Sequence, residues 1–404
     1  MTGVLRALRH RPFALLWGGQ ALSRVGDFVY DIALMWWVLE ETGSAALMGL
    51  VLVVNMVPTA LFTLLGGVLV DRFPRVRTMV LSDVGRALIT GSIAVLAVTD
   101  RLTVPAVLVA TALSGFVEAF FQPAYTAIVP ELTPEDDLPS ANALTSMSVQ
   151  VARVIGPAAG AAVVALGGTD LAFAINAVSF LVAGSLLVPL LRLAEPPRDP
   201  EATSDLLADL REGLAFVRRQ PWLWVNILVG AFGNIGLAGP FSVAMPFLVS
   251  EAMQRDVGTL GYLYAVFPIG YLLGGIWIGR QVRLKRPGLL AEAGVLVAGL
   301  GLAAFALPLP IWALTVAALI NGAGLEVFTV VWVSTMQRLV PTELLGRVAS
   351  IDQVGSIALL PIGFALAGWA TDHFGPAAVF AAGGVSTAVV ALAAMAHPAV
   401  RRLE

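Results

Sequence analysis

Twelve long apolar stretches cover most of this 404-residue sequence and restrict it to folds that cross a lipid bilayer. A helix needs about 20 mostly apolar residues to cross the hydrocarbon core. Hydrophobic residues make up 58% of the chain and charged residues 13%, and the Gly and Pro content fits close-packed helices better than barrel strands. The predicted spans are 13–39, 46–70, 78–98, 104–125, 140–166, 170–191, 222–249, 257–279, 289–308, 311–336, 344–370 and 374–396.

The basic residues indicate on which side of the membrane the termini lie. Most of the 24 Lys and Arg residues precede the first span or fall in the even-numbered connections and the tail, whereas the opposite loops hold Arg101 and Arg255. Loops rich in Lys and Arg stay in the cytoplasm. We therefore expect an integral protein of a prokaryotic inner or plasma membrane, with both termini cytoplasmic.

One long polar connection divides the chain. Residues 192–221 contain a Pro-rich stretch followed by an amphipathic segment near 204–219, which predicts a linker and a helix on the cytoplasmic membrane surface. The expected organisation is an N-terminal six-helix bundle at 1–191, a cytoplasmic linker with an amphipathic helix at 192–221, and a C-terminal six-helix bundle at 222–404.

The two halves repeat the same sequence pattern at an offset of 208 residues. Gly66–Arg75 reads GGVLVDRFPR, and Gly274–Arg283 reads GGIWIGRQVR. At the same offset, Glu118 in the fourth span matches Glu326 in the tenth. Such repeats are typical of transporters built from two related halves.

Three stretches carry a resemblance to a known family: Ser23-Arg24-Val25-Gly26-Asp27 with Ile32-Ala33-Leu34, Gly67-x-x-x-Asp71-Arg72-x-x-Arg75, and Gly156-Pro157-x-x-Gly160. On these motifs the whole chain resembles a major facilitator superfamily transporter, and it is most similar to the drug and siderophore exporter branch, which includes macrolide-efflux and enterobactin-exporter proteins. The resemblance implies an all-α integral membrane fold of twelve transmembrane helices in two pseudo-symmetric six-helix bundles. It also implies a substrate path between the bundles and a monomer.

The loop after the second span matches the family's gating signature, which is similar to a latch on the cytoplasmic side. The residues that carry this implied role are Asp71, Arg72 and Arg75. Plain anchoring at the membrane edge is the alternative for the two arginines. Pro74 and Val76 depart from the family pattern, which usually has glycine and a base there.

The fifth span resembles the family's antiporter motif through Gly156, Pro157 and Gly160. Glycine lets a facing helix approach closely, and proline removes a backbone hydrogen bond and bends the helix. The motif supports export, and generic close packing is an equally good explanation.

The first span carries three charged residues on one helix face, Arg24, Asp27 and Asp31, at spacings of three and four. Charges within a span are costly, so they face a water-filled path or one another. An ion pair between Arg24 and Asp27 is one arrangement, and it would leave Asp31 to bind protons or a cationic substrate.

Glu118 and Glu326 lie nearer the middle of their spans than the other carboxylates, with no base within four positions. Together with Asp27 and Asp31 they are the predicted proton- or cation-coupling residues. An intramembrane carboxylate is costly while it is charged, and it becomes neutral when it binds a proton. The alternative is a glutamate that stabilises helix contacts. Arg86 and Arg153 are possible charge partners, whereas residues 104–125 contain no base.

Polar and aromatic side chains within the spans are weaker candidates for a substrate cavity. Amides are costly in lipid and usually face protein or water, whereas packing or lipid contact competes as an explanation for the aromatic residues. The cavity candidates are Arg24, Tyr30, Asn55, Phe121, Asn234, Asn321, Trp332 and Gln353.

The sequence also excludes several classes of function. It has no phosphate-binding Gly-rich loop for ATP, no cysteine, and three scattered histidines, so we expect no cofactor and no metal. The net charge of −3 is spread along the membrane edges and predicts no nucleic-acid partner. No nucleophile and base lie in a catalytic arrangement, so we do not expect an enzyme.

These observations predict secondary active export of small amphipathic molecules of the drug or siderophore class. Transport would proceed by alternating access as proton-coupled antiport, with the substrate, protons and membrane lipid as partners. A lipid or lysolipid transporter and an uncoupled facilitator or channel are the alternatives.

Overall fold

The computed structural model describes residues 3–70, 74–192, 206–281 and 285–403, and among these it contains helices and no strands. The first half of the chain holds η1 (Gly3–Arg9), α1 (Arg11–Thr42), α2 (Ala45–Val70), α3 (Arg75–Val98), α4 (Val104–Leu132), η2 (Glu135–Asp137), α5 (Leu138–Leu187) and η3 (Val188–Arg192). The second half holds α6 (Leu206–Arg219), α7 (Pro221–Gly239), η4 (Pro240–Ala244), α8 (Met245–Phe247), η5 (Leu248–Ala252), α9 (Val257–Gly279), α10 (Pro287–Ala303), η6 (Ala304–Ala306), α11 (Ile311–Leu339), α12 (Thr342–Ile357), α13 (Leu360–Phe374), α14 (Pro376–Ala396) and α15 (Pro398–Arg401).

Each of the twelve predicted spans coincides with a helix or a run of helices. Ten helical runs of the described chain are long and apolar enough to cross a membrane. Two features explain the difference in number. The α5 run contains two predicted spans, and α1 carries the three charged residues that the sequence places in its first span.

The break inside α5 lies at Gly167 and Gly168. Gly167 has φ −144° and ψ 15°, and Gly168 has φ 77° and ψ 175°, so the helical path stops and restarts. A side chain is strongly disfavoured at a φ such as that of Gly168, whereas glycine adopts it readily. The Gly-Gly pair therefore joins two spans by a tight connection.

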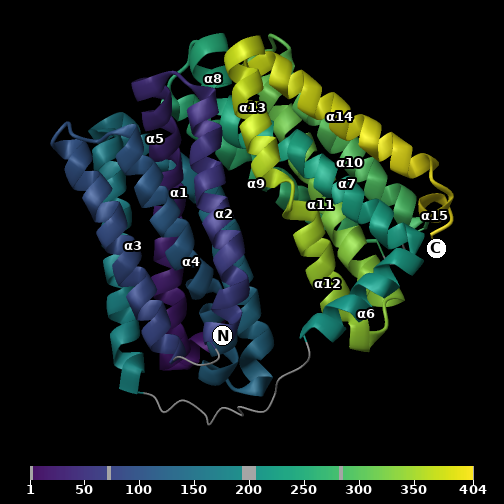
Figure 1. The fold of residues 1–404 in the computed structure, drawn as a ribbon, viewed down its shortest axis with the longest axis horizontal. Helices are drawn as coiled ribbons and strands as arrows, with labels where there is room; N and C mark the ends of the chain where they lie inside the picture. Colours follow the sequence, from purple (N-terminus) through teal and green to yellow (C-terminus); the bar gives the residue numbers. More distant parts are fainter. Residues whose placement is uncertain (1–2, 71–73, 193–205, 282–284, 404) are drawn as a thin grey trace. The chain divides into compact units, whose positions relative to one another are not determined.

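The helices form two compact units. Unit 1 contains residues 1–43, 51–198 and 256–265, and unit 2 contains residues 44–50, 199–255 and 266–404. In unit 1, α5 packs along both α1 and α3 (Figure 1). In unit 2, α10 packs along α11 and α14, while α7 lies against α12, α13 and α14.

The linker helix α6 docks on unit 2. Its Val217 is 3% exposed and belongs to an apolar cluster with Trp222 and Leu223. An ion pair joins Glu212 of α6 to Arg347 of α12. The amphipathic segment thus forms a helix whose Val217 packs against protein, and its place on the membrane surface stays a prediction.

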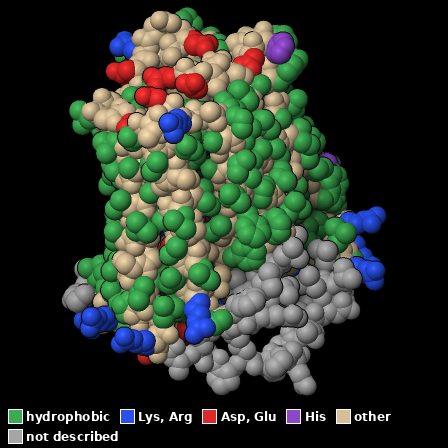
Figure 2. All heavy atoms as spheres, turned by 60° about the vertical axis from the view of Figure 1, so that its left-hand side comes forward, with side chains coloured by type: hydrophobic (Ala, Val, Ile, Leu, Met, Phe, Trp, Pro, Cys, Tyr) green, Lys and Arg blue, Asp and Glu red, His purple; other side chains and the backbone are tan. Residues whose placement is uncertain are grey.

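Large apolar side chains cover the outside of the helices. Leu81, Leu166 and Trp312 are 70%, 89% and 71% exposed. On the face in Figure 2, apolar side chains occupy the middle, Asp and Glu gather at the upper end, and Lys and Arg lie at the lower left, at the right edge and in part at the upper end. A surface with an apolar middle and charged ends suits a helical protein in a bilayer.

Glycines bring α1 and α5 into close contact in unit 1. A Cβ atom on Gly156 would lie 2.4 Å from the Cβ of Phe28, and one on Gly160 would lie 3.0 Å from the Cα of Val29. Small residues allow this approach, which strengthens van der Waals packing where lipid supplies no hydrophobic driving force. The observed contribution of Gly156 and Gly160 is therefore to helix packing beside the charged part of α1.

We predict that Gly156→Ala lowers the free energy of unfolding by about 1–3 kcal/mol, because an added methyl group overpacks the α1–α5 contact. Thermal unfolding of the purified protein in detergent would measure the effect. Gly18→Ala on α1 is the matched control, since no atom lies within 4 Å of its Cβ position. Equal unfolding temperatures for the two variants would contradict the prediction.

Candidate functional site

A charged cluster lies among the helices of unit 1. The guanidinium of Arg86 on α3 pairs with Asp27 on α1, with Nη2 at 3.2 Å from Oδ1 and 3.3 Å from Oδ2. The same guanidinium lies over the ring of Phe180 on α5, 4.2 Å from its centroid. Arg86 is therefore held between a carboxylate on one helix and an aromatic face on another.

Two further predicted carboxylates belong to this cluster. Glu118 of α4 lies within electrostatic range of Arg86, Asp27 and Asp31. Three of the four predicted coupling carboxylates thus surround one arginine, which the sequence analysis names as a possible partner. Like charges so close repel one another, and one guanidinium cannot neutralise all three.

The structure favours Arg86 over Arg24 as the ion-pair partner of Asp27. The Arg24 guanidinium lies over the Tyr125 ring, 5.8 Å from its centroid. The i, i+3 spacing permitted an Arg24–Asp27 pair, but packing turns Arg24 toward α4.

The fourth predicted carboxylate, Glu326, lies in unit 2. It faces α9, because a Cβ atom on Gly275 would lie 3.4 Å from Oε1 of Glu326. The sequence repeat therefore places Glu118 and Glu326 at matching positions with different surroundings.

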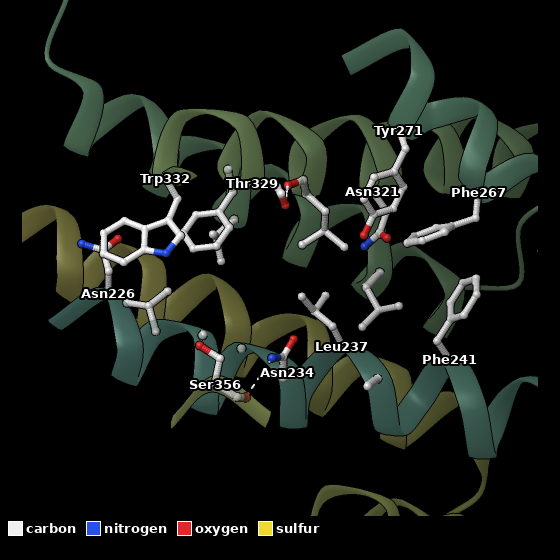
Figure 3. A pocket seen from close by; sticks show the side chains of 18 of the residues that line it. Asn226, Asn234, Leu237, Phe241, Phe267, Tyr271, Asn321, Thr329, Trp332 and Ser356 are labelled. Carbon is white, nitrogen blue, oxygen red and sulfur yellow. Dashed lines mark hydrogen bonds between the residues drawn. The ribbon is translucent and has the colours of Figure 1, made fainter. Parts of the chain in front are cut away.

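A cavity of about 500 Å³ opens among the helices of unit 2 (Figure 3). Aromatic side chains line it together with three amides, hydroxyl groups and one carboxylate. The polar and aromatic lining residues are Asn226, Asn234, Phe241, Ser242, Phe267, Tyr271, Asn321, Phe328, Thr329, Trp332, Asp352 and Ser356. In Figure 3, Phe241, Phe267 and Tyr271 stand at one end of the cavity, and Trp332 and Asn226 stand at the other.

The C-terminal end of α12 forms part of the cavity wall. The predicted span 344–370 consists of α12 and α13, and Pro361 lacks the N–H that would continue the helix past Ile357. Asn234 of α7 donates a hydrogen bond of 2.9 Å to the backbone oxygen of Ser356 (Figure 3). The last carbonyl groups of a helix have no partner within the helix, and the side-chain amide of Asn234 supplies one here.

Hydrogen bonds fix the orientation of the other polar lining groups. Trp332 donates a hydrogen bond of 3.0 Å to Oδ2 of Asp352, and Asn321 donates a hydrogen bond of 2.6 Å to the backbone oxygen of Ala298. One N–H of each amide side chain is thereby committed to protein, and the cavity presents its polar groups in fixed directions.

Three of the predicted cavity residues line this cavity: Asn234, Asn321 and Trp332. The other five lie elsewhere. Phe121 is 1% exposed in the core of unit 1, and Tyr30 packs on Phe173 with ring centroids 5.3 Å apart. Gln353 is exposed, Arg24 faces Tyr125, and the backbone oxygen of Asn55 accepts a hydrogen bond of 2.8 Å from Thr59.

Of the three predicted gating residues, the structure describes Arg75. Asp71 and Arg72 lie outside the described residues. Arg75 donates a hydrogen bond of 3.0 Å to the backbone oxygen of Ala127 and forms an ion pair with Glu131. It therefore ties the beginning of α3 to the end of α4.

Sequence reasoning missed several residues that the structure brings forward. Phe241, Phe267 and Tyr271 line the cavity without any sequence signal beyond their aromatic character. Asp83 and Glu292 are 0% exposed carboxylates within predicted spans, and the cost of an intramembrane charge could have flagged both. Among the described residues, no group of three or more His, Cys, Asp or Glu could hold a metal ion.

The bundle of apolar helices, with a charged cluster in one unit and an amphipathic cavity in the other, is that of an integral membrane transporter. The sequence model of the Major Facilitator Superfamily matches residues 16–355 and, in a second match, residues 231–402. The chain belongs to the Major Facilitator Superfamily, and it is a transporter and not an enzyme.

Relatives named as efflux proteins resemble the chain over nearly its whole length. Macrolide efflux protein A of Streptococcus pyogenes is 25% identical over 398 residues, which cover 97% of each chain. Enterobactin exporter EntS of Shigella boydii is 26% identical over 384 residues, which cover 94% of this chain and 90% of the exporter. The predicted likeness to the drug and siderophore exporter branch is confirmed.

Solved transporter structures share the fold. A bacterial homologue of the iron transporter ferroportin in the inward-facing state has a TM-score of 0.75 and 18% identity, covering 96% of this chain and 99% of that one. The nucleoside transporter NupG has a TM-score of 0.71 and 14% identity, covering 95% and 98%. The predicted all-α fold of two six-helix bundles is confirmed.

We predict that Arg86→Gln lowers the free energy of unfolding by about 1–3 kcal/mol, since removing one partner of a partly buried ion pair leaves an uncompensated charge. Thermal unfolding in detergent would report the loss. Adding Asp27→Asn should restore part of the stability, because the carboxylate no longer needs a cation. Arg77→Gln, at an exposed position of α3, is the control. A double variant less stable than Arg86→Gln alone would contradict the pairing.

Proposed function

We propose that the protein exports small amphipathic molecules of the drug or siderophore class by alternating access, coupled to proton entry. The observation that carries this proposal is the amphipathic cavity of unit 2, taken with relatives named for macrolide efflux and enterobactin export. Its volume of about 500 Å³ falls within the range of about 300–1,000 Å³ that is typical of ligand pockets.

The cavity lining suits a molecule with both apolar and polar surfaces. The rings of Phe241 and Phe267 pack in a tilted arrangement at a centroid distance of 4.6 Å, and Phe267 contacts Tyr271 at 5.1 Å, which gives an aromatic wall for ring or alkyl surfaces. Asn234 and Asp352 supply polar contacts. A carboxylate in the wall favours a substrate that carries an amine.

The charged cluster of unit 1 supports proton coupling. Asp27, Asp31 and Glu118 share Arg86, so proton binding relieves their mutual repulsion. In this proposal Asp27, Asp31, Glu118 and Glu326 carry the protons or cations.

In alternating access, the substrate path between the bundles at 1–191 and 222–404 would open first to one side of the membrane and then to the other. Asp71, Arg72 and Arg75 would gate the cytoplasmic side, and the Gly156-Pro157-x-x-Gly160 motif would act in antiport. The Lys and Arg residues before the first span and in the even-numbered connections support cytoplasmic termini. The functional unit in this proposal is a monomer.

We predict that erythromycin, added to liposomes containing the protein, drives a change of internal pH. Glu118→Gln should reduce this substrate-dependent proton flux at least tenfold, because the cluster loses a group that can exchange a proton, and Glu326→Gln tests the second glutamate in the same way. A fluorescent pH indicator inside the liposomes measures the flux, enterobactin is the second probe, and the exposed Glu343→Gln is the control. Erythromycin movement without proton movement would refute antiport and favour a facilitator or a lipid transporter.

We also predict that Phe267→Ala weakens erythromycin binding about tenfold, since an aromatic contact contributes about 0.5–1.5 kcal/mol beyond the area it buries. Equilibrium binding of radiolabelled erythromycin to purified protein would measure the change. Phe232→Ala is the control, because Phe232 is 50% exposed and does not line the cavity. Equal affinities for both variants would place the binding site elsewhere.

A further inference from the structure

Glu292 is a buried carboxyl group that the proposed mechanism does not use. It lies in the second turn of α10, is 0% exposed, and neither of its oxygens has a hydrogen-bond partner among the described residues. Such groups are rare, because buried polar atoms normally find partners. Its presence therefore requires an explanation.

Among the residues that the structure describes, none is paired with Glu292 as a counter-charge. Helix α10 packs against α7, α11, α14 and α15, and neither α7 nor α14 contains a charged residue. The titratable and charged groups on the other packed elements are Glu326 and Arg338 of α11, His397 at the start of α15, Arg401 of α15, and Arg286 at the start of α10 itself. None of these groups forms a hydrogen bond with the carboxyl group of Glu292.

An ionised carboxylate in such a place is strongly unfavourable. Water is excluded, no cation compensates the charge, and no donor satisfies its oxygens. Apolar side chains surround this part of the fold, among them Val225, Val295 and Val400. The neutral, proton-bearing form of Glu292 is the form that this packing accommodates.

The position of Glu292 connects it to the cavity. Val295, three residues further along α10 and so on the same side of the helix, lines the cavity, as does Asn226 of α7. Glu292 lies one helical turn from that wall. Rearrangement of the wall by water or a ligand would change how well Glu292 is shielded.

The first half of the chain carries a related group. Asp83 in α3 is 0% exposed, and both its oxygens lack hydrogen-bond partners among the described residues. It stands 209 residues before Glu292, one position from the 208-residue repeat. Arg86 lies within electrostatic range of Asp83, so the two halves differ in that only the Asp83 side has a described cation nearby.

We propose that Glu292 is a proton-binding site of unit 2, occupied by a proton in the described packing and emptied when the cavity wall beside it opens. Its link to transport rests on the proposed function, whereas proton binding itself does not. The ligand is the proton, and the binding atom is a carboxylate oxygen of Glu292.

Infrared difference spectroscopy of the detergent-solubilised protein tests proton binding directly. A protonated carboxyl group gives a carbonyl stretching band that a carboxylate lacks, and carbon-13 labelling of glutamate identifies a glutamic acid band. Glu118→Gln and Glu326→Gln are present in all the proteins compared, so that these two glutamates contribute no band. In that background we expect the band at neutral pH, its loss on adding Glu292→Gln, and its retention on adding the exposed Glu343→Gln. Absence of the band from the background protein, or its survival after Glu292→Gln is added, would overturn the proposal.

A second variant guards against misfolding of the first. Glu292→Leu should keep the unfolding temperature of the background protein within a few degrees, because the site accommodates a neutral group, and it should also lack the band. A Glu292→Leu protein that retains the band refutes the assignment.

Transport separates this inference from the proposed function. If erythromycin drives proton flux in wild-type liposomes and Glu292→Gln reduces that flux, both hold. If the wild type moves no protons but the infrared band depends on Glu292, antiport fails and the proton site stands. If proton flux is present and the band does not depend on Glu292, the proton site fails and antiport stands.

Discussion

The absence of hydrogen-bond partners in the bilayer interior is the constraint on which this structure depends. It forces the backbone into helices, and the chain departs from helical geometry where glycine or proline permits it and protein supplies partners. At Gly167 and Gly168 the departure makes a tight connection between two spans. At the C-terminal end of α12 the backbone oxygen of Ser356 accepts a hydrogen bond from Asn234, and Ser356 lines a cavity.

Close helix packing then determines where charge can be held. A Cβ atom on Gly26 would lie 2.4 Å from Oγ of Ser179. The backbone of α1 at Gly26 therefore packs directly against side chains of α5. This approach sets Asp27 within reach of Arg86, while Phe180 of α5 covers the guanidinium. Glycine spacing in one helix pair thus positions the carboxylate, the arginine and the aromatic face together.

The fold and part of the site could be predicted from sequence, because the relevant signals are strong. Span length and the cost of intramembrane charge identify the helices and the carboxylates Asp27, Asp31 and Glu118. The cavity was much harder to predict, because helices that are apolar on all sides carry no periodicity to show which face turns inward. Phe121 was therefore assigned to a cavity although it lies in the core, and Phe267 was missed.

The repeat in the sequence does not make the two halves equivalent in chemistry. Glu118 lies near Arg86, but the residue 208 positions after Arg86 is Gly294, and a Cβ atom there would lie 2.5 Å from the backbone oxygen of Gly324. The close contact of α10 with α11 leaves no room for an arginine, so Glu326 cannot have the counterpart of that partner. Unit 1 holds a cluster in which several carboxylates share one arginine, whereas unit 2 holds an amphipathic cavity whose wall carries one carboxylate, Asp352. The same sequence pattern thus places an arginine beside a glutamate in one half, whereas in the other half the close helix contact at Gly294 excludes one.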